Sequence, residues 1–137
     1  MALDPMMRDR HRVTRHTRIV IDGFGRSANS YARAAFELAN GPERIASHIH
    51  SHRAIQLGVK YRLPVIALVR DPRPVIASAL QYTPEVAPLH AIRHWIRYYV
   101  HVLPLVDDVV LGDFPDVVAD FGAVIGRVND RFGTSFT

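Results

Sequence analysis

The chain of 137 residues contains no cysteine, so it can form neither a disulfide nor a thiolate metal site. It also contains no apolar run approaching the roughly 18 residues that a membrane-spanning helix requires. Its first residues are basic and polar, and they lack the apolar segment of a signal peptide. These absences predict a cytoplasmic protein that has no membrane partner.

Apolar residues make up 48% of the chain, which is enough for a hydrophobic core in a chain the length of one ordinary domain. The residues before the first apolar run are polar and basic, and chain termini of this kind are commonly unconstrained. We therefore predict a flexible basic arm over residues 1–17 and a single α/β domain over residues 18–137.

The basic residues are almost all arginine: of 17 lysines and arginines only Lys60 is a lysine, and the formal net charge is +4. A guanidinium forks onto two oxygens of a phosphate or sulfate, so this bias favours an anionic ligand, although genomic base composition explains it equally well. The densest basic cluster, residues 8–18, falls largely in the predicted arm and contains no interleaved Phe, Tyr or Trp. Nucleic-acid binding is therefore not predicted.

Short apolar runs alternate with amphipathic segments along the domain. Four runs are typical of buried strands, and they lie at residues 18–22, 44–49, 65–69 and 109–114. Helices are predicted between and after them, from the first loop to residue 40 and over residues 53–59, 73–81, 90–103 and 121–132. This alternation predicts a parallel sheet covered by helices on both faces, a three-layer α/β fold.

Residues 19–36 read IVIDGFGRSANSYARAAF, a strand that turns through Gly23 and Gly25 into a helix. Backbone N–H groups converge at such a helix start, where the helix dipole favours negative charge. The loop is therefore typical of a phosphate site and of a P-loop NTPase-like sheet. We expect Ser27 or Asn29 to cap the helix. The expected inward face of this helix is Tyr31, Ala34, Ala35 and Leu38.

The loop does not match the nucleotide triphosphatase pattern GxxxxGK[ST] well. Aligned from Gly23, it has Ala28 at the second glycine and Asn29 at the lysine, and among the later positions only Ser30 fits. Phosphoryl transfer relies on the charge of that lysine, so ATP or GTP hydrolysis is disfavoured. The dinucleotide pattern GxGxxG is met only as GxGxxA, and histidines stand where an acidic residue is required.

The segment GFGRSANSY resembles the 5′-phosphosulfate loop, GxP[KR]SGTTW, of the sulfotransferases that use 3′-phosphoadenosine 5′-phosphosulfate (PAPS). The resemblance implies that Arg26 holds the phosphosulfate and stabilises charge in catalysis, and that Tyr31 stacks on adenine. Gly25 in place of proline and Ala28 in place of glycine depart from the pattern. The implied donor-binding residues are Gly23, Gly25, Arg26, Ser27, Ala28, Asn29, Ser30 and Tyr31.

A second segment, LVRDPRPVIAS at residues 68–78, resembles the 3′-phosphate element of the same family. The resemblance implies that Arg70 and Ser78 grip the 3′-phosphate. Arg70 follows a predicted strand and Ser78 lies about two turns into the next helix, so both fall near the carboxyl edge where α/β sheets bind ligands. Taken alone, the sequence RDP is as typical of a salt-bridged turn.

Between these segments lies HIHSHRA, in which His48, His50 and His52 alternate. Alternation at the end of a strand directs all three side chains to one face. The family has a Lys-Ser/Thr-His element near this position, which implies His52 as the catalytic base, with His48 as a substitute. A neutral imidazole can take a proton from an alcohol. Two other interpretations stay open: exposed strand-end residues, and a zinc site, for which no further ligand accompanies the histidines.

The resemblance covers residues 18–136 and implies transfer of the sulfonyl group of PAPS to a hydroxyl or amine of a small-molecule or glycan acceptor, without a metal ion. The glycine- and lysine-rich segment that closes over the nucleotide in longer members is not found in this sequence. Two alternatives are a non-catalytic module that binds 3′-phosphoadenosine 5′-phosphate (PAP) or another nucleotide, and a P-loop kinase-like protein.

Overall fold

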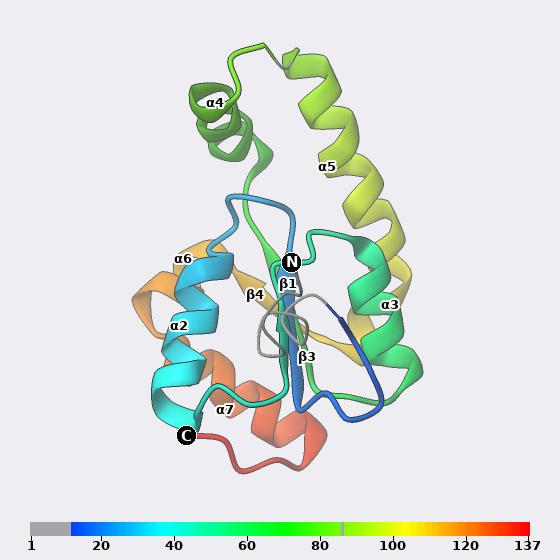
Figure 1. The fold of residues 1–137 in the computed structure, drawn as a ribbon, viewed down its shortest axis with the longest axis vertical. Coiled ribbons are helices and arrows are strands. Elements are labelled where there is room, and N and C mark those ends of the chain that lie inside the picture. The colour runs from blue at the N-terminus through cyan, green and yellow to red at the C-terminus, as the bar shows by residue number, and fades with distance from the viewer. Residues whose placement is uncertain (1–11, 86) are drawn as a thin grey trace, which may run out of the picture.

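A computed structural model describes residues 12–85 and 87–137 of the chain. At its centre is a sheet of four parallel strands in the order β2-β1-β3-β4 (Figure 1). The strands are β1 (Ile19–Gly23), β2 (Ile45–Ser47), β3 (Val65–Val69) and β4 (Val110–Asp113). The predicted parallel four-stranded sheet is confirmed, and each strand lies within about one residue of its predicted run or inside it.

Helices connect the strands. They are α2 (Asn29–Asn40), α3 (His52–Lys60), α4 (Pro72–Tyr82), α5 (Pro88–Val102), α6 (Phe114–Ala119) and α7 (Phe121–Phe132), with a 3₁₀ helix η1 (Leu103–Asp108) after α5. The five predicted helices are confirmed. Sequence patterns did not indicate η1 or α6, because each is only six residues long and has a proline in its first turn, so neither shows a helical period.

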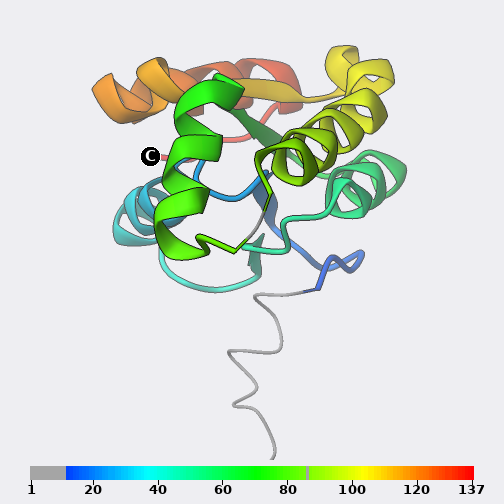
Figure 2. The same ribbon diagram turned by 90° about the horizontal axis from the view of Figure 1, so that it is seen from above.

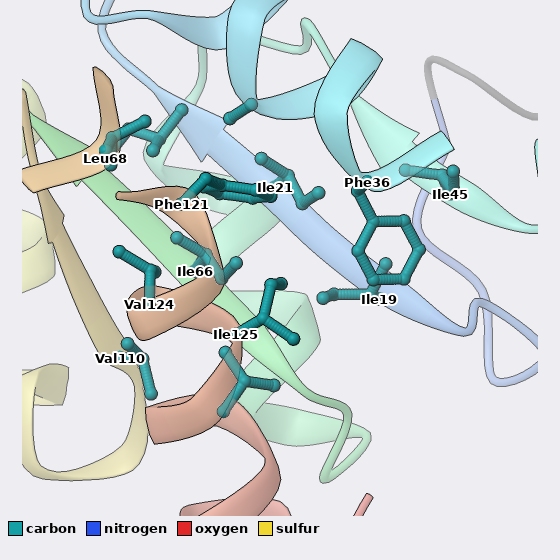
Figure 3. Packing of buried hydrophobic residues seen from close by; sticks show 13 residues of the cluster. Ile19, Ile21, Phe36, Ile45, Ile66, Leu68, Val110, Phe121, Val124 and Ile125 are labelled. Carbon is teal, nitrogen blue, oxygen red and sulfur yellow. The ribbon is translucent and has the colours of Figure 1, made fainter. Parts of the chain in front are cut away.

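The helices form a layer on each face of the sheet (Figures 1 and 2). Ile19 and Ile21 of β1 point into an apolar cluster with α2, α6 and α7, where Phe36 and Phe121 pack against them (Figure 3). Val20 of β1 points the other way, into a second cluster with α3 and α5. The alternation of buried side chains along each strand therefore produces the predicted α/β sandwich of three layers.

The inward face of α2 differs from the prediction. Tyr31 is 48% exposed and Leu38 is 91% exposed, whereas Ala32, Arg33 and Phe36 are buried. Arg33 was not among the residues expected to face inward, and its guanidinium donates to Ile45 O and Ser47 Oγ and pairs with Glu37. Because the buried guanidinium has hydrogen-bond partners, the side of α2 that carries Arg33 can face the sheet in place of the predicted apolar side.

The cap of α2 also differs from the prediction. Its N-cap is Ala28, in the left-handed conformation at φ 71°, and no side chain caps the helix. Asn29 instead donates from Nδ2 to Phe24 O, which ties the loop back on itself. The backbone N–H groups at the start of α2 are therefore not occupied by a capping side chain.

The chain order creates a switch point at the carboxyl edge of the sheet. From β1 the chain passes through α2 to β2 on one side, and from β2 it crosses β1 through α3 to reach β3 on the other side. The loops after β1 and β3 therefore separate at the edge where open α/β sheets bind ligands. Helix α4 lies beyond this edge (Figure 1).

The end of β1 lies very close to β3. Gly23 is in register with Leu68, and a Cβ atom built on Gly23 would be 2.5 Å from Leu68 O. Only glycine allows this approach, which brings the first residues of the two loops together.

Residues 12–17 of the predicted arm pack on the domain, since Val13 is 7% exposed and joins the cluster with α3 and α5. Residues 1–11, which make up the rest of that arm, lie outside the described residues. In the part of the chain that the structure describes, we find no helix with the length and apolar character needed to cross a membrane.

Candidate active site

The loop after β1, residues 24–28, contains two non-glycine residues in the left-handed conformation, Arg26 at φ 67° and Ala28 at φ 71°. Such residues are strained by about 1–3 kcal/mol each, and strain of this kind is found at functional sites as well as in tight turns. Gly25 lies between the strand and these residues, and a Cβ built on it would have no atom within 4 Å. The space beside Gly25 is open, so a ligand can approach the backbone there.

Several polar groups of this loop have no protein partner. The backbone N–H groups of residues 25–28 donate to no other residue in the described parts of the chain. Asn29 Oδ1 is buried without a hydrogen bond, and the buried Ser27 hydroxyl lies near the Tyr99 hydroxyl without hydrogen-bond geometry. Buried polar groups are normally paired, and the loop amides and the Ser27 hydroxyl are donors that an anion would satisfy. Asn29 Oδ1 can only accept, so it would need a donor from a ligand.

Arg26 contacts a helix that is remote in the sequence. Its Nε donates to Ser78 Oγ of α4 at 2.8 Å, across 52 residues of chain, and its guanidinium lies 4.4 Å from the centre of the Tyr82 ring. Arg26 is an exposed residue, so these contacts hold a cation at the surface of the loop.

Arg70 returns to the same loop from the end of β3. Its Nη1 donates to Arg26 O at 3.0 Å, and its guanidinium lies 3.8 Å from the centre of the Phe114 ring. The next two residues that carry charge, Asp71 and Arg73, form a separate exposed salt bridge of 2.6 Å. That bridge lowers the pKa of Asp71 to about 2. The RDP segment thus contains both a salt-bridged turn and an arginine that reaches the first loop.

A pocket of about 430 Å³ opens beside the loop. It contains no acidic residue, and its lining includes one arginine and two histidines. Ser30 and the half-exposed Tyr31 contribute side chains to it from the first turn of α2. The full lining is Gly25, Arg26, Ala28, Asn29, Ser30, Tyr31, His48, His50, Phe114 and Val118.

The three histidines do not share one face, which corrects the prediction from their alternation. Strand β2 ends at Ser47, and His48 and His50 both have left-handed backbones, at φ 58° and φ 53°. His52 is the first residue of α3. Period-two alternation requires extended backbone, and it is lost at the first left-handed residue.

Each histidine has its own surroundings. His48 is bonded through both ring nitrogens, Nδ1 to Ser47 Oγ at 3.0 Å and Nε2 to Ser30 Oγ at 3.1 Å. His50 is bonded through Nδ1 to Gly23 O at 3.0 Å. His50 therefore lies against the end of β1, and both His48 and His50 line the pocket beside the loop after β1.

His52 is not part of the pocket lining. Its ring stacks on His101 of α5 at 4.0 Å between centres and 16° between planes. Burial lowers the pKa of His52, and the neighbouring charges of His101, Arg97 and Arg53 lower it further. The catalytic role of His52 stays a prediction, and the geometry places two other histidines closer to the loop.

Sequence reasoning missed Asp22, Tyr98 and Tyr99. Asp22 is fully buried at the end of β1, and Tyr98 donates to its Oδ2 at 2.8 Å. Tyr99 donates to Leu68 O at 2.7 Å and accepts from Phe24 N. Burial raises the pKa of Asp22 above its ordinary value and the pKa of Tyr99 to about 12. The available signal was an aspartate as the fourth residue of a buried strand, since a buried charge requires hydrogen-bond donors.

Neither the scan against protein-family models nor the search of curated proteins gives a match for this sequence. Among residues 12–85 and 87–137, no three His, Asp or Glu side chains are grouped so that they could hold a metal ion. The sulfotransferase resemblance therefore stays a prediction.

Proposed function

We propose that the chain binds PAPS at the carboxyl edge of β1 and β3 and transfers its sulfonyl group to a hydroxyl or amine acceptor, in a sheet of the P-loop NTPase type. The observation that carries the proposal is the convergence of two remote segments. Arg26 bonds to Ser78, and Arg70 bonds to the backbone of Arg26. A ligand with two phosphate groups fits such paired elements, since both guanidinium groups and a hydroxyl are held at one edge.

In this proposal the loop amides, Ser27 and Arg26 hold the 5′-phosphosulfate, where their fixed dipoles and charge stabilise the leaving phosphate. Arg70 and Ser78 hold the 3′-phosphate. Tyr31 lines the pocket together with Arg26 and offers an exposed ring to the adenine, whereas Arg70 and Ser78 lie outside the lining of that pocket. The unpaired N–H groups of residues 25–28 support this assignment, because they have no other acceptor among the described residues.

His50 is better placed than His52 as the catalytic base. His50 lines the pocket together with Arg26, and one of its ring nitrogens has no bond to the described residues. His48 is also in the pocket, but both of its nitrogens are bonded to hydroxyl groups. We therefore assign the proton-accepting role to His50 and retain His48 as a brace between β2 and α2.

The first test is calorimetry with PAP, followed by an assay for transfer from sulfur-labelled PAPS to a panel of phenols, alcohols, amines and glycans. We expect one PAP to bind and one class of acceptor to become labelled. Arg26→Ala should lower turnover by about 10²-fold, because a charge that stabilises the leaving group is lost. Arg73→Ala is the matched control, since that guanidinium bonds to Asp71 through Nε and Nη2.

Other outcomes favour the alternatives. PAP binding without turnover on any acceptor would favour a non-catalytic nucleotide-binding module. Hydrolysis of ATP that is lost in Arg26→Ala would favour a kinase-like activity.

A further inference from the structure

The Asp22 carboxylate is fully buried and receives three hydrogen bonds. Its Oδ1 accepts from Ile49 N at 2.9 Å and from His50 N at 3.0 Å, and its Oδ2 accepts from the Tyr98 hydroxyl at 2.8 Å. The two amide groups can only donate, and the Tyr98 hydroxyl donates its hydrogen bond to Oδ2. All three bonds therefore suit an ionised carboxylate, which only accepts. Asp22 therefore ties the segment containing His50 to the end of β1.

A further contact of this segment, between the His50 ring and Gly23 O, determines which ring nitrogen carries the proton. Nδ1 lies 3.0 Å from Gly23 O, and a carbonyl oxygen can only accept, so Nδ1 carries the proton in the neutral ring. The lone pair is then on Nε2, which is bonded to no residue in the described parts of the chain. Because His50 lines the pocket, it can offer an unprotonated nitrogen to a ligand there.

The backbone of His50 is in a conformation that needs support. Its φ of 53° is left-handed, a conformation that is strained for a non-glycine residue. The bond from its N–H to Asp22 and the bond from its ring to Gly23 O together hold this conformation. Loss of the Asp22 contacts would let the segment relax toward extended backbone and would move the ring.

Two successive tyrosines of α5 support two different loops. Tyr98 bonds to Asp22, and through it to the His50 segment. Tyr99 bonds to Leu68 O and Phe24 N, and so to the loop after β1. Removing one hydroxyl at a time therefore perturbs the two loops separately.

We propose that Asp22 and Tyr98 are positioning residues that hold His50 with Nδ1 protonated and Nε2 available as the proton acceptor. The inference rests on the proposed function. In the transfer step, Nε2 takes the proton of the acceptor hydroxyl while the acceptor oxygen forms a bond to sulfur. The bond between sulfur and the bridging oxygen breaks, PAP leaves with that electron pair, and His50 becomes an imidazolium.

The test is a double-mutant cycle on the turnover number, measured with the acceptor that is labelled fastest in the panel. His50→Ala should lower the turnover number by about 10²–10⁴-fold, the contribution of a general base. Tyr98→Phe should lower it by about tenfold with an unchanged KM for PAPS, as one hydrogen bond to a charged group is lost. In the His50→Ala background, Tyr98→Phe should change the turnover number by less than about twofold, because the imidazole ring that Tyr98 helps to position is absent.

Tyr99→Phe is the matched control, with a hydroxyl removed from the next residue of the same helix. It should raise the KM for PAPS, and its effect should persist in the His50→Ala background. If Tyr98→Phe instead lowers turnover equally in both backgrounds, Tyr98 acts through general stability and the inference is wrong.

A second measurement needs no acceptor. Nitrogen chemical shifts of the neutral His50 ring should report the Nδ1–H tautomer in the wild-type chain and a mixture of tautomers in Asp22→Asn or, if that variant does not fold, in Tyr98→Phe. An Nε2–H tautomer in the wild type would overturn the inference. If the tautomer is as expected but PAP does not bind, the proposed function fails while the positioning contacts remain.

Discussion

The two faces of strand β1 carry different chemistry. Ile19 and Ile21 face α2 and α7 and join an apolar cluster (Figure 3). Val20 and Asp22 face α3 and α5, where Asp22 places a buried carboxylate beside Tyr98. The first face stabilises the fold by apolar burial, and the second fixes the loops at the carboxyl edge. One strand thus serves the core and the site, and substitutions on its two faces should have separable effects.

The largest expected effect is on the apolar face. Phe36→Ala removes a 1% exposed ring that packs on this cluster, so we expect the free energy of unfolding to fall by about 3–5 kcal/mol. Leu38→Ala on the same helix is the control, since Leu38 is 91% exposed and should change it by less than about 0.5 kcal/mol. Chemical denaturation measures both. Similar losses in the two variants would contradict the burial of the helix.

The end of β1 offers a second comparison. Gly23→Ala places a methyl group 2.5 Å from Leu68 O, so we expect a loss of about 1–3 kcal/mol in the free energy of unfolding. The methyl group added by Gly25→Ala meets no atom within 4 Å, so this variant should lower the free energy of unfolding by less than about 0.5 kcal/mol. It should also weaken PAP binding, because Gly25 lines the pocket. Denaturation and calorimetry on both variants separate the two roles. A destabilised Gly25→Ala would show that the loop is packed rather than open.

The polar face predicts a dependence of stability on pH. Burial raises the pKa of folded Asp22 above its ordinary value of 3.8, so the folded chain holds this proton more tightly than the unfolded chain. The stabilisation is fully present below pH 3.8 and is lost as pH rises through the folded pKa, with a slope of at most about 1.4 kcal/mol per pH unit. The difference in unfolding free energy between wild type and Asp22→Asn should follow this course. A difference that does not vary with pH would mean that Asp22 has an ordinary pKa.

The smallest expected effect is at the outer edge of the same face. His101→Asn removes a neighbouring charge from His52, so the pKa of His52 should rise toward 6.5 without reaching it, because burial is the larger cause of its depression. Proton NMR titration of the His52 ring measures this. A lower pKa in the variant would show that the stacked ring supports the protonated form.

Much of the fold could be predicted because the sequence signals were local. The continuous run VIALV identified β3, and Gly133 marked the end of α7, where it has a left-handed φ of 65°. The expected proximity of the segments around Arg26 and Arg70 followed from parallel strands that share a carboxyl edge.

The wrong predictions, of the inward face of α2 and of a common face for the three histidines, have one physical origin in hydrogen bonds between residues that are remote in the sequence. Arg33 is buried because it meets the end of β2, and His50 has left-handed backbone because Asp22 holds its N–H. Periodicity in one segment carries no information about partners that lie 12 or 28 residues away. Tyr98, which is 76 residues from Asp22, could not be assigned for the same reason.

The central claim is that two segments bind the two ends of one doubly phosphorylated adenosine, and its most direct test is the affinity for PAP relative to adenosine 5′-phosphate. We predict that the wild-type chain prefers PAP and that Arg70→Ala lowers this preference by about 10–100-fold, while Arg73→Ala leaves it unchanged. Disturbance of the loop alone would weaken both nucleotides equally. A wild-type chain without preference for PAP, or an Arg70→Ala variant that keeps the full preference, would contradict the account.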